Sequence, residues 1–130
     1  MKPVRSGAWQ CKVLVAAAAM HLGAASAQQP LHDDPSLARA WQALRTVNCE
    51  RCHGAGYTGL AAPSIVEYAR TQDRAAFVRM VMQGDPPRGM PGYGGNPLVA
   101  DNIDGIHRYF LGRADRSIEA ADRPGPVSGP

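Results

Sequence analysis

The clearest helical pattern in the chain begins shortly after residue 33. Apolar side chains recur there at intervals of three or four positions, at Leu37, Ala40, Trp41 and Leu44. Asp34 and Pro35 form a typical helix start, because the carboxylate accepts hydrogen bonds from free backbone N–H groups and proline suits the first helical position. The pattern therefore predicts a helix from Pro35 to about Val47.

Three shorter helices are predicted farther along the chain, separated by turn-forming residues. They cover about Ser64 to Ala69, Gln72 to Gln83 with Thr71 as the cap, and Asp101 to Leu111. Before the last of them, residues 84–97 hold five glycines and four prolines in fourteen positions, too many for a helix or an inner strand. No segment has the alternating pattern of a strand, so the chain is predicted to be all-α.

The first 27 residues have the pattern of a cleavable signal peptide. A basic region precedes an alanine-rich apolar run and contains Lys2, Arg5 and Lys12. The run ends in a small-residue cleavage pattern, Ala25-Ser26-Ala27. The run is a poor membrane span, which needs about 20 apolar residues, and we expect no span in the mature chain. We expect export to the periplasm, with a signal peptide at 1–27, one domain at 28–113 and a mobile Pro/Gly-rich tail at 114–130.

Removal of this leader changes both the charge and the cysteine count. The full chain has 14 basic and 11 acidic residues, and three of the basic residues lie in the leader, so the mature chain is formally neutral. A neutral chain gives no electrostatic support for nucleic-acid binding. Cys11 also leaves with the leader, and Cys49 and Cys52 remain.

These two cysteines belong to the sequence Cys49-Glu50-Arg51-Cys52-His53, which is typical of a c-type haem attachment site. Residues three apart share a face of a helical turn, so both sulfurs can reach the two vinyl groups of one porphyrin. The next side chain then points beneath the ring, where an imidazole nitrogen can bind iron. The alternatives are a thioredoxin-type dithiol and half of a zinc site, but no βαβ unit and no second CxxC or HxxxH accompanies the pair.

Iron held in this way needs a sixth ligand or an open position. Met90 is the best candidate, because its turn-rich loop can bring one thioether to the far face of the ring. Met80 and Met82 lie on a predicted helix, where methionine usually fills the core. His107 is a rival, although a lone histidine among apolar neighbours on a helix is more often packed or capped than bound to metal.

From about Pro35 to Arg113, the chain resembles a class I, single-haem cytochrome c. The haem motif, Pro63, Met90-Pro91 and the helices at both ends carry this resemblance. It implies a small helical fold wrapped around one covalent haem c, whose first and last helices cross. It also implies His53 and Met90 as axial ligands of the iron, and the Pro63 carbonyl as acceptor of the imidazole N–H. Where the family often has a glycine and an aromatic in its first helix, this chain has Trp41 and Arg45.

The expected function depends on the ligands of the iron. Two strong ligands favour an electron carrier, whereas a peroxidase-like enzyme or a haem-based sensor needs an open or displaceable sixth position. We expect a monomeric periplasmic carrier, not an enzyme, that takes single electrons from a dehydrogenase and passes them to an oxidase or another cytochrome. Met90–Tyr93 and Ile106–Arg113 also look like small cytochromes that accept electrons from periplasmic quinoprotein alcohol dehydrogenases. Arg45, Arg51 and Arg88 flank the haem segments, either as docking residues or as solvated side chains.

Overall fold

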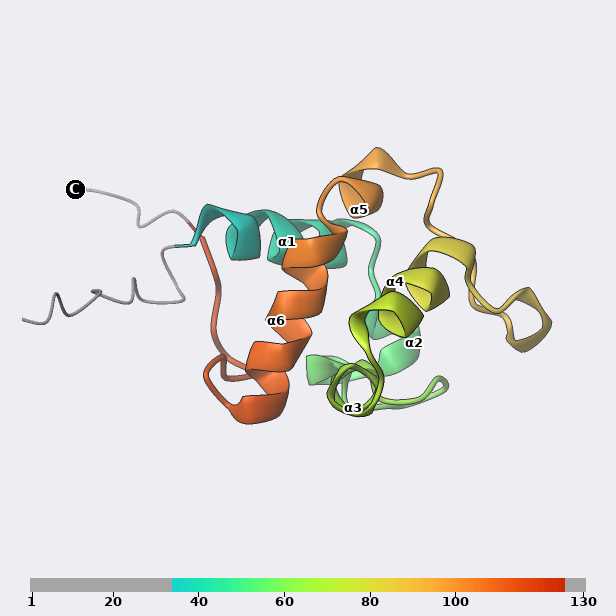
Figure 1. Ribbon diagram of the computed structural model, residues 1–130. Coiled ribbons are helices and arrows are strands. Elements are labelled where there is room, and N and C mark those ends of the chain that lie inside the picture. The colour runs from blue at the N-terminus through green and yellow to red at the C-terminus, as the bar shows by residue number, and fades with distance from the viewer. Residues whose placement is uncertain (1–33, 126–130) are drawn as a thin grey trace, which may run out of the picture.

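The computed structural model describes residues 34–125, so the predicted signal peptide lies outside the described residues. The described chain is helical and contains no strand, which confirms the predicted all-α class (Figure 1). Its elements, in order, are α1 Pro35–Thr46, α2 Glu50–His53, the 3-10 turn η2 Ala55–Tyr57, α3 Ile65–Thr71, α4 Arg74–Gln83, the 3-10 turn η3 Pro86–Arg88, α5 Pro97–Ala100 and α6 Ile103–Asp115. Within this described part, no helix has the length and apolar character that crossing a bilayer requires.

The first and last helices cross, as the resemblance implied, and the crossing depends on a glycine in the last one (Figure 1). A β-carbon on Gly105 of α6 would lie 2.7 Å from the carbonyl oxygen of Ser36 and 3.3 Å from the β-carbon of Ala40. The two backbones can approach this closely only because position 105 has no side chain. Trp41 is partly buried, and its ring centroid is 6.0 Å and 5.8 Å from the guanidinium carbons of Arg45 and Arg123.

Aromatic rings from three segments fill the centre of the molecule. Tyr57 meets Phe110 edge-on at 5.1 Å and Tyr109 edge-on at 6.2 Å between ring centroids. Phe77 of α4 lies 6.1 Å from Phe110. All four side chains are buried, so this cluster joins α4, α6 and the segment after α2 in one core.

Side-chain caps set the ends of the inner helices and correct two sequence-based boundaries. α4 begins at Arg74 because the carboxylate of Asp73 accepts from Ala76 N–H at 2.7 Å. The predicted cap Thr71 is instead the last residue of α3, where its hydroxyl donates to the Glu67 carbonyl at 2.8 Å. Before α6, Asn96 caps the short helix α5, which the sequence did not predict.

The segment after residue 113, predicted as a mobile tail, begins within α6 and then packs on it. α6 continues to Asp115, and Ile118 is only 2% exposed. Ile118 N–H donates to the Gly112 carbonyl at 3.0 Å, and its side chain occupies the space that a β-carbon on Gly112 would need. The core therefore extends at least to Ile118, while the outer limits of the domain stay a prediction.

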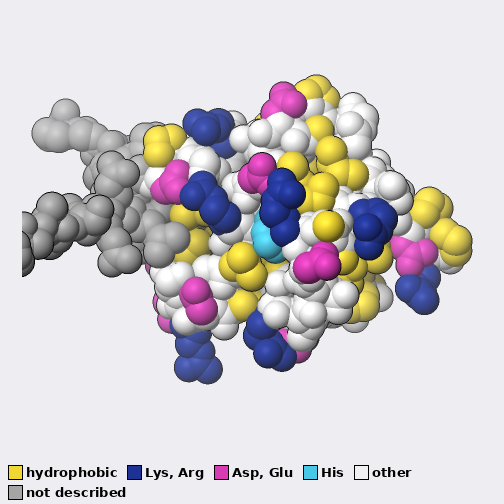
Figure 2. Space-filling model, in the orientation of Figure 1, with side chains coloured by type: hydrophobic (Ala, Val, Ile, Leu, Met, Phe, Trp, Pro, Cys, Tyr) yellow, Lys and Arg dark blue, Asp and Glu magenta, His cyan; other side chains and the backbone are white. Residues whose placement is uncertain are grey.

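Ion pairs connect the helices across the surface, where basic and acidic side chains are mixed. Arg108 of α6 pairs with Asp34 before α1, and Arg74 of α4 pairs with Asp104 of α6. Figure 2 shows basic and acidic side chains interspersed over the face toward the viewer. These pairs are exposed, and such pairs contribute about 0–1 kcal/mol each, so the fold depends mainly on its core.

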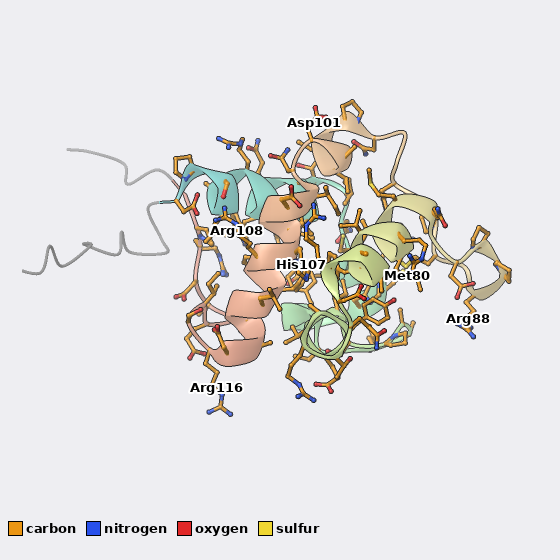
Figure 3. All side chains as sticks on the ribbon, in the orientation of Figure 1. Met80, Arg88, Asp101, His107, Arg108 and Arg116 are labelled. Carbon is orange, nitrogen blue, oxygen red and sulfur yellow. The ribbon has the colours of Figure 1, made fainter. Side chains whose placement is uncertain are left out.

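His107 lies between α6 and α4, where the labelled side chain appears in Figure 3. Its ring is 4.9 Å from the Phe77 ring, the residue is 8% exposed, and Nε2 has no hydrogen-bond partner among the described residues. Burial lowers the pKa of His107, the nearby Arg74 lowers it further, and Asp104 opposes this change. The folded protein therefore favours the neutral imidazole.

We predict that His107 weakens the fold as the pH falls. Below the ordinary histidine pKa of about 6.5, the unfolded chain binds a proton at this position more readily than the folded chain does. The contribution of neutral His107 to the free energy of unfolding is thus fully present above that pKa. Below it, this contribution declines by at most about 1.4 kcal/mol per pH unit, because one proton is involved. Guanidinium unfolding of the holoprotein from pH 8 to pH 5 should show a shallower decline for His107→Leu than for the wild type. Parallel pH profiles would contradict this assignment.

Candidate functional site

The sequence Cys49–His53 lies at a tightly fixed junction between α1 and α2. Asn48 has a positive φ of 56°, which turns the chain sharply at the end of α1. Glu50 stabilises this turn, because its carboxylate accepts hydrogen bonds from Arg45 at 2.8 Å and from Gly56 N–H at 3.2 Å. Cys49 is half-buried and Cys52 is exposed. Burial raises the pKa of the Cys49 thiol to about 11, so the neutral thiol is favoured there.

The loop after α2 folds back onto the carbonyl groups of the motif. Gly59 N–H donates to the His53 carbonyl at 2.7 Å, and Ala62 N–H donates to the Cys52 carbonyl at 2.9 Å. Gly54 has a φ of 80°, and a β-carbon there would lie 2.6 Å from the Gly59 carbonyl oxygen. This close return brings Pro63 beside the imidazole.

His53 is oriented by one short hydrogen bond. Its Nδ1 lies 2.7 Å from the carbonyl oxygen of Pro63. A carbonyl only accepts, so Nδ1 carries the proton and Nε2 keeps its lone pair free. This is the tautomer that a metal-binding histidine needs, and the contact agrees with the one that the resemblance implied for Pro63.

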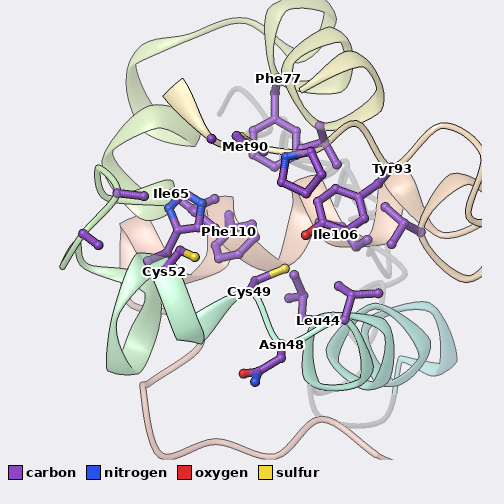
Figure 4. Close-up of a pocket in the computed structure, with 18 of the residues that line it drawn as sticks. Leu44, Asn48, Cys49, Cys52, Ile65, Phe77, Met90, Tyr93, Ile106 and Phe110 are labelled. Carbon is purple, nitrogen blue, oxygen red and sulfur yellow. The ribbon is translucent and has the colours of Figure 1, made fainter. Parts of the chain in front are cut away.

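The four sequence-predicted site residues line one apolar cavity of about 190 Å³ (Figure 4). Cys49 and Cys52 lie on one side of it, and Met90 lies on the opposite side. Apolar side chains from α1, α4 and α6 contribute to the remaining wall, namely Leu44, Phe77, Val81, Ile106 and Phe110. The structure therefore brings together residues that are separated by about forty positions in the sequence.

A second cavity of about 310 Å³ continues the first between α3 and α4. It is also lined by His53 and Met90, and it adds Tyr68 and Met80. The sequence predicts that Met80 fills the core, but Met80 contributes to the cavity wall. Its position three residues after the buried Phe77 places both side chains on one face of α4, which is the signal that could have indicated this location. His107 lines neither cavity.

The loop that carries Met90 is closed at its base by two glycines. Gly84 and Gly92 touch so closely that a β-carbon on Gly84 would lie 2.5 Å from the Gly92 nitrogen, and one on Gly92 would lie 2.6 Å from the Gln83 carbonyl oxygen. Inside the loop, Asp85 and Met90 exchange two backbone hydrogen bonds of 2.9 and 3.1 Å. Beyond it, Tyr93 N–H donates to the Val81 carbonyl at 3.0 Å. The backbone of Met90 is thus fixed relative to the end of α4.

This combination of groups suits a porphyrin held by two sulfurs and two axial ligands. The two thiols and an imidazole with a free nitrogen come from one short helical segment, and a thioether from a distant loop lines the same apolar cavity. Among residues 34–125, no three His, Cys, Asp or Glu side chains cluster as a metal site made by the protein alone. The chemistry of the donor set therefore fits haem c.

Comparison with known proteins agrees with a haem c site. The family model described as cytochrome c oxidase, cbb3-type, subunit III matches residues 32–110. Cytochrome c-555 of Methylococcus capsulatus is 30% identical over 115 residues, which cover 85% of this chain and 90% of that protein. The crystal structure of the c-type cytochrome XoxG from Methylobacterium extorquens AM1 superposes with a TM-score of 0.61 at 22% identity. That match covers 70% of this chain and 57% of the XoxG chain, and it concerns the fold.

We predict that Gly84→Ala damages the Met90 loop far more than Gly89→Ala does. Both glycines have positive φ, 71° and 85°, so alanine costs roughly 1–2 kcal/mol of backbone strain at either position. Only at Gly84 would the new β-carbon also meet three backbone atoms at 2.5 Å, whereas nothing lies within 4 Å of it at Gly89. Thermal unfolding of the two holoprotein variants should therefore show a clearly lower Tm for Gly84→Ala. Equal Tm values would show that the two loop ends are not in close contact.

Proposed function

Because the chain belongs to the cytochrome c family and carries covalently bound haem c, we propose that Cys49 and Cys52 form the two thioether bonds and that His53 and Met90 are the axial ligands. The hydrogen bond from His53 Nδ1 to the Pro63 carbonyl is the observation that supports this assignment best. It holds the imidazole in one orientation and leaves Nε2 as the free donor atom. Cys49 and Cys52 lie beside it on the same short helical segment.

Met90 is the proposed distal ligand because its loop is rigid and faces the motif across the cavity. The paired hydrogen bonds with Asp85 and the contact between Gly84 and Gly92 fix the backbone of Met90. A preorganised ligand loses little conformational entropy on binding. A neutral thioether also favours ferrous iron and therefore a high reduction potential.

These ligands support a role as a carrier of single electrons. Haem iron would supply a one-electron ferric/ferrous couple, and protein ligands at both axial positions would close it to substrates. Phe77, Ile106 and Phe110 give the cavity an apolar wall, and two axial protein ligands would leave no open position on the iron for a substrate. A peroxidase-like enzyme or a sensor, in contrast, requires an open or displaceable position.

We place this carrier in the periplasm as a monomer, with a dehydrogenase as the donor and an oxidase or another cytochrome as the acceptor. The signal-peptide pattern at residues 1–27 supports the location. The resemblance of Met90–Tyr93 and Ile106–Arg113 to acceptors of quinoprotein alcohol dehydrogenases supports that class of donor. Interspersed charges on the surface fit a short-lived encounter, which usually buries less than about 1,200 Å².

We predict that Met90→Ala opens the iron to external ligands. The oxidised variant should bind cyanide or imidazole readily, and its reduction potential should fall because a thioether that favours ferrous iron is lost. Absorption spectra with and without the added ligand, together with redox titration, measure both effects.

Met80→Leu is the matched control, because Met80 lines the second cavity with Met90 but lies on α4. It should keep the wild-type spectrum and potential. If Met80→Leu opens the iron and Met90→Ala does not, the ligand assignment is wrong.

The carrier role predicts rapid reduction by a suitable donor. A quinoprotein alcohol dehydrogenase reduced by its alcohol should reduce the oxidised holoprotein in a stopped-flow experiment, with a rate proportional to cytochrome concentration at low concentration. Mass spectrometry of the same preparation should first locate one haem on the peptide that contains Cys49 and Cys52. No reduction by a dehydrogenase, combined with peroxide turnover or tight binding of carbon monoxide, would favour an enzyme or a sensor instead.

A further inference from the structure

His107 is a buried titratable group that the proposed haem site does not use. It lies at the interface of α4 and α6, is 8% exposed and lines neither cavity. Its Nε2 atom is buried without a hydrogen-bond partner among residues 34–125. A nitrogen in that position has no fixed donor or acceptor that sets its protonation state. Burial and the surrounding charges therefore decide how tightly this imidazole binds a proton.

A single aromatic ring connects His107 with the proposed haem site. The centroid of the Phe77 ring lies 4.9 Å from that of the imidazole. Phe77 also lines both cavities, together with His53 and Met90. Figure 3 labels His107 beside α6, and Figure 4 labels Phe77 at the cavity. Because Phe77 is only 1% exposed, the medium between the imidazole and the site is protein rather than water.

Such a medium transmits a change of charge better than water does. Reduction of haem iron by one electron removes one positive charge from the site. At an effective dielectric constant of about 20, two unit charges roughly 10 Å apart interact by an amount that corresponds to about tenfold in an equilibrium constant. One intervening ring places His107 within such a range of the cavity. The oxidation state of the iron should therefore change the proton affinity of His107.

The charged groups around His107 are arranged in exposed ion pairs. Arg74 of α4 pairs with Asp104 of α6. Burial lowers the pKa of His107 most, Arg74 lowers it further, and Asp104 raises it. The helices α3 and α1 also pack on α6, and the ion pairs at these contacts are Glu67 with Arg70 within α3 and Asp34 before α1 with Arg108 of α6. Each of these pairs has a formal charge of zero.

We propose that His107 is a redox-linked proton site, at which the protein takes up a proton from water when the haem iron is reduced. This inference rests on the proposed function as an electron carrier. The ferric protein gains one electron from the donor, and the neutral imidazole gains one proton from water and becomes imidazolium. On oxidation, the electron passes to the acceptor and the proton returns to water. The imidazole N–H bond is the only bond that forms or breaks.

This proton uptake is confined to a defined pH range. The ordinary pKa of histidine is about 6.5, and burial and Arg74 hold the pKa of His107 below that value. Above pH 7, the imidazole is neutral in both oxidation states, so His107 does not affect the reduction potential. As the pH falls below 6.5, binding of a proton favours the ferrous protein, and the reduction potential rises.

The test measures the same coupling in two ways on the holoprotein. Redox titration between pH 8 and pH 4 should show a potential that rises as the pH falls. His107→Gln should lack a part of this rise that corresponds to a tenfold change in proton affinity, or about 59 mV for one electron. Histidine NMR signals should give His107 a pKa about one pH unit higher in the ferrous than in the ferric protein. The two results must agree, because linkage between two binding events is reciprocal.

Two surface variants should move this pH range without changing the imidazole. Arg74→Gln removes a positive charge that lowers the pKa of His107, so the rise in potential should begin at a higher pH. Asp104→Asn removes the carboxylate that raises this pKa, so the rise should begin at a lower pH. Arg108→Gln is the matched control. Arg108 follows His107 in the sequence but pairs with Asp34, and its loss should move the range less.

Each outcome separates the proton site from the carrier role. A reversible one-electron couple with the same pH dependence in the wild type and His107→Gln would overturn the proton site and leave the carrier role intact. Equal pKa values of His107 in the two oxidation states would do the same. If His107→Gln changes the absorption spectrum at pH 8, the substitution disturbs the haem ligands, and the wild-type NMR titration then decides without any variant. A holoprotein without a reversible one-electron couple would overturn the carrier role itself.

Discussion

The hydrogen bond between His53 and Pro63 is the interaction on which the proposed site depends. A histidine after two cysteines is useful only if one particular nitrogen is free and points into the cavity. The Pro63 carbonyl selects that nitrogen by accepting from the other one at 2.7 Å. The turn from Gly54 to Ala62 positions this carbonyl. It is held against the motif because two of its backbone N–H groups donate to the carbonyls of Cys52 and His53.

The opposite wall of the cavity is positioned by a different device. A loop of nine residues carries Met90, and close backbone contact between Gly84 and Gly92 closes it at the base. One side of the site is thus fixed by hydrogen bonds to a short helix, and the other by backbone packing that leaves no space for side chains. The aromatic cluster of Tyr57, Phe77 and Phe110 joins the elements that carry these two sides.

Much of the architecture follows from local sequence signals. The spacing of Leu37, Ala40 and Leu44 predicts α1 almost to the residue, because one apolar stripe is buried against α6. The Cys-x-x-Cys-His spacing identifies the chemistry, since few other sites require those residue types at those intervals.

Features that depend on distant contacts could not be predicted in the same way. The sequence around Gly105 does not show that the carbonyl oxygen of Ser36 approaches it. The boundary at Thr71 was wrong because two polar residues two positions apart, Thr71 and Asp73, can both act as the cap. The carboxylate of Asp73 accepts from the α4 backbone, while the Thr71 hydroxyl bonds back into α3.

The packing of Ile118 shows that the buried core extends beyond the last residue that the family model matches. The family match ends at residue 110, yet Ile118 fills the space over Gly112 and is as buried as the central residues of α6. A truncated protein cut where the similarity stops would lose the end of a helix and expose an apolar face that Ile118 otherwise covers. Fusion partners, tags and chimeric junctions at the C-terminal side are therefore compatible with the fold only when they begin after this isoleucine.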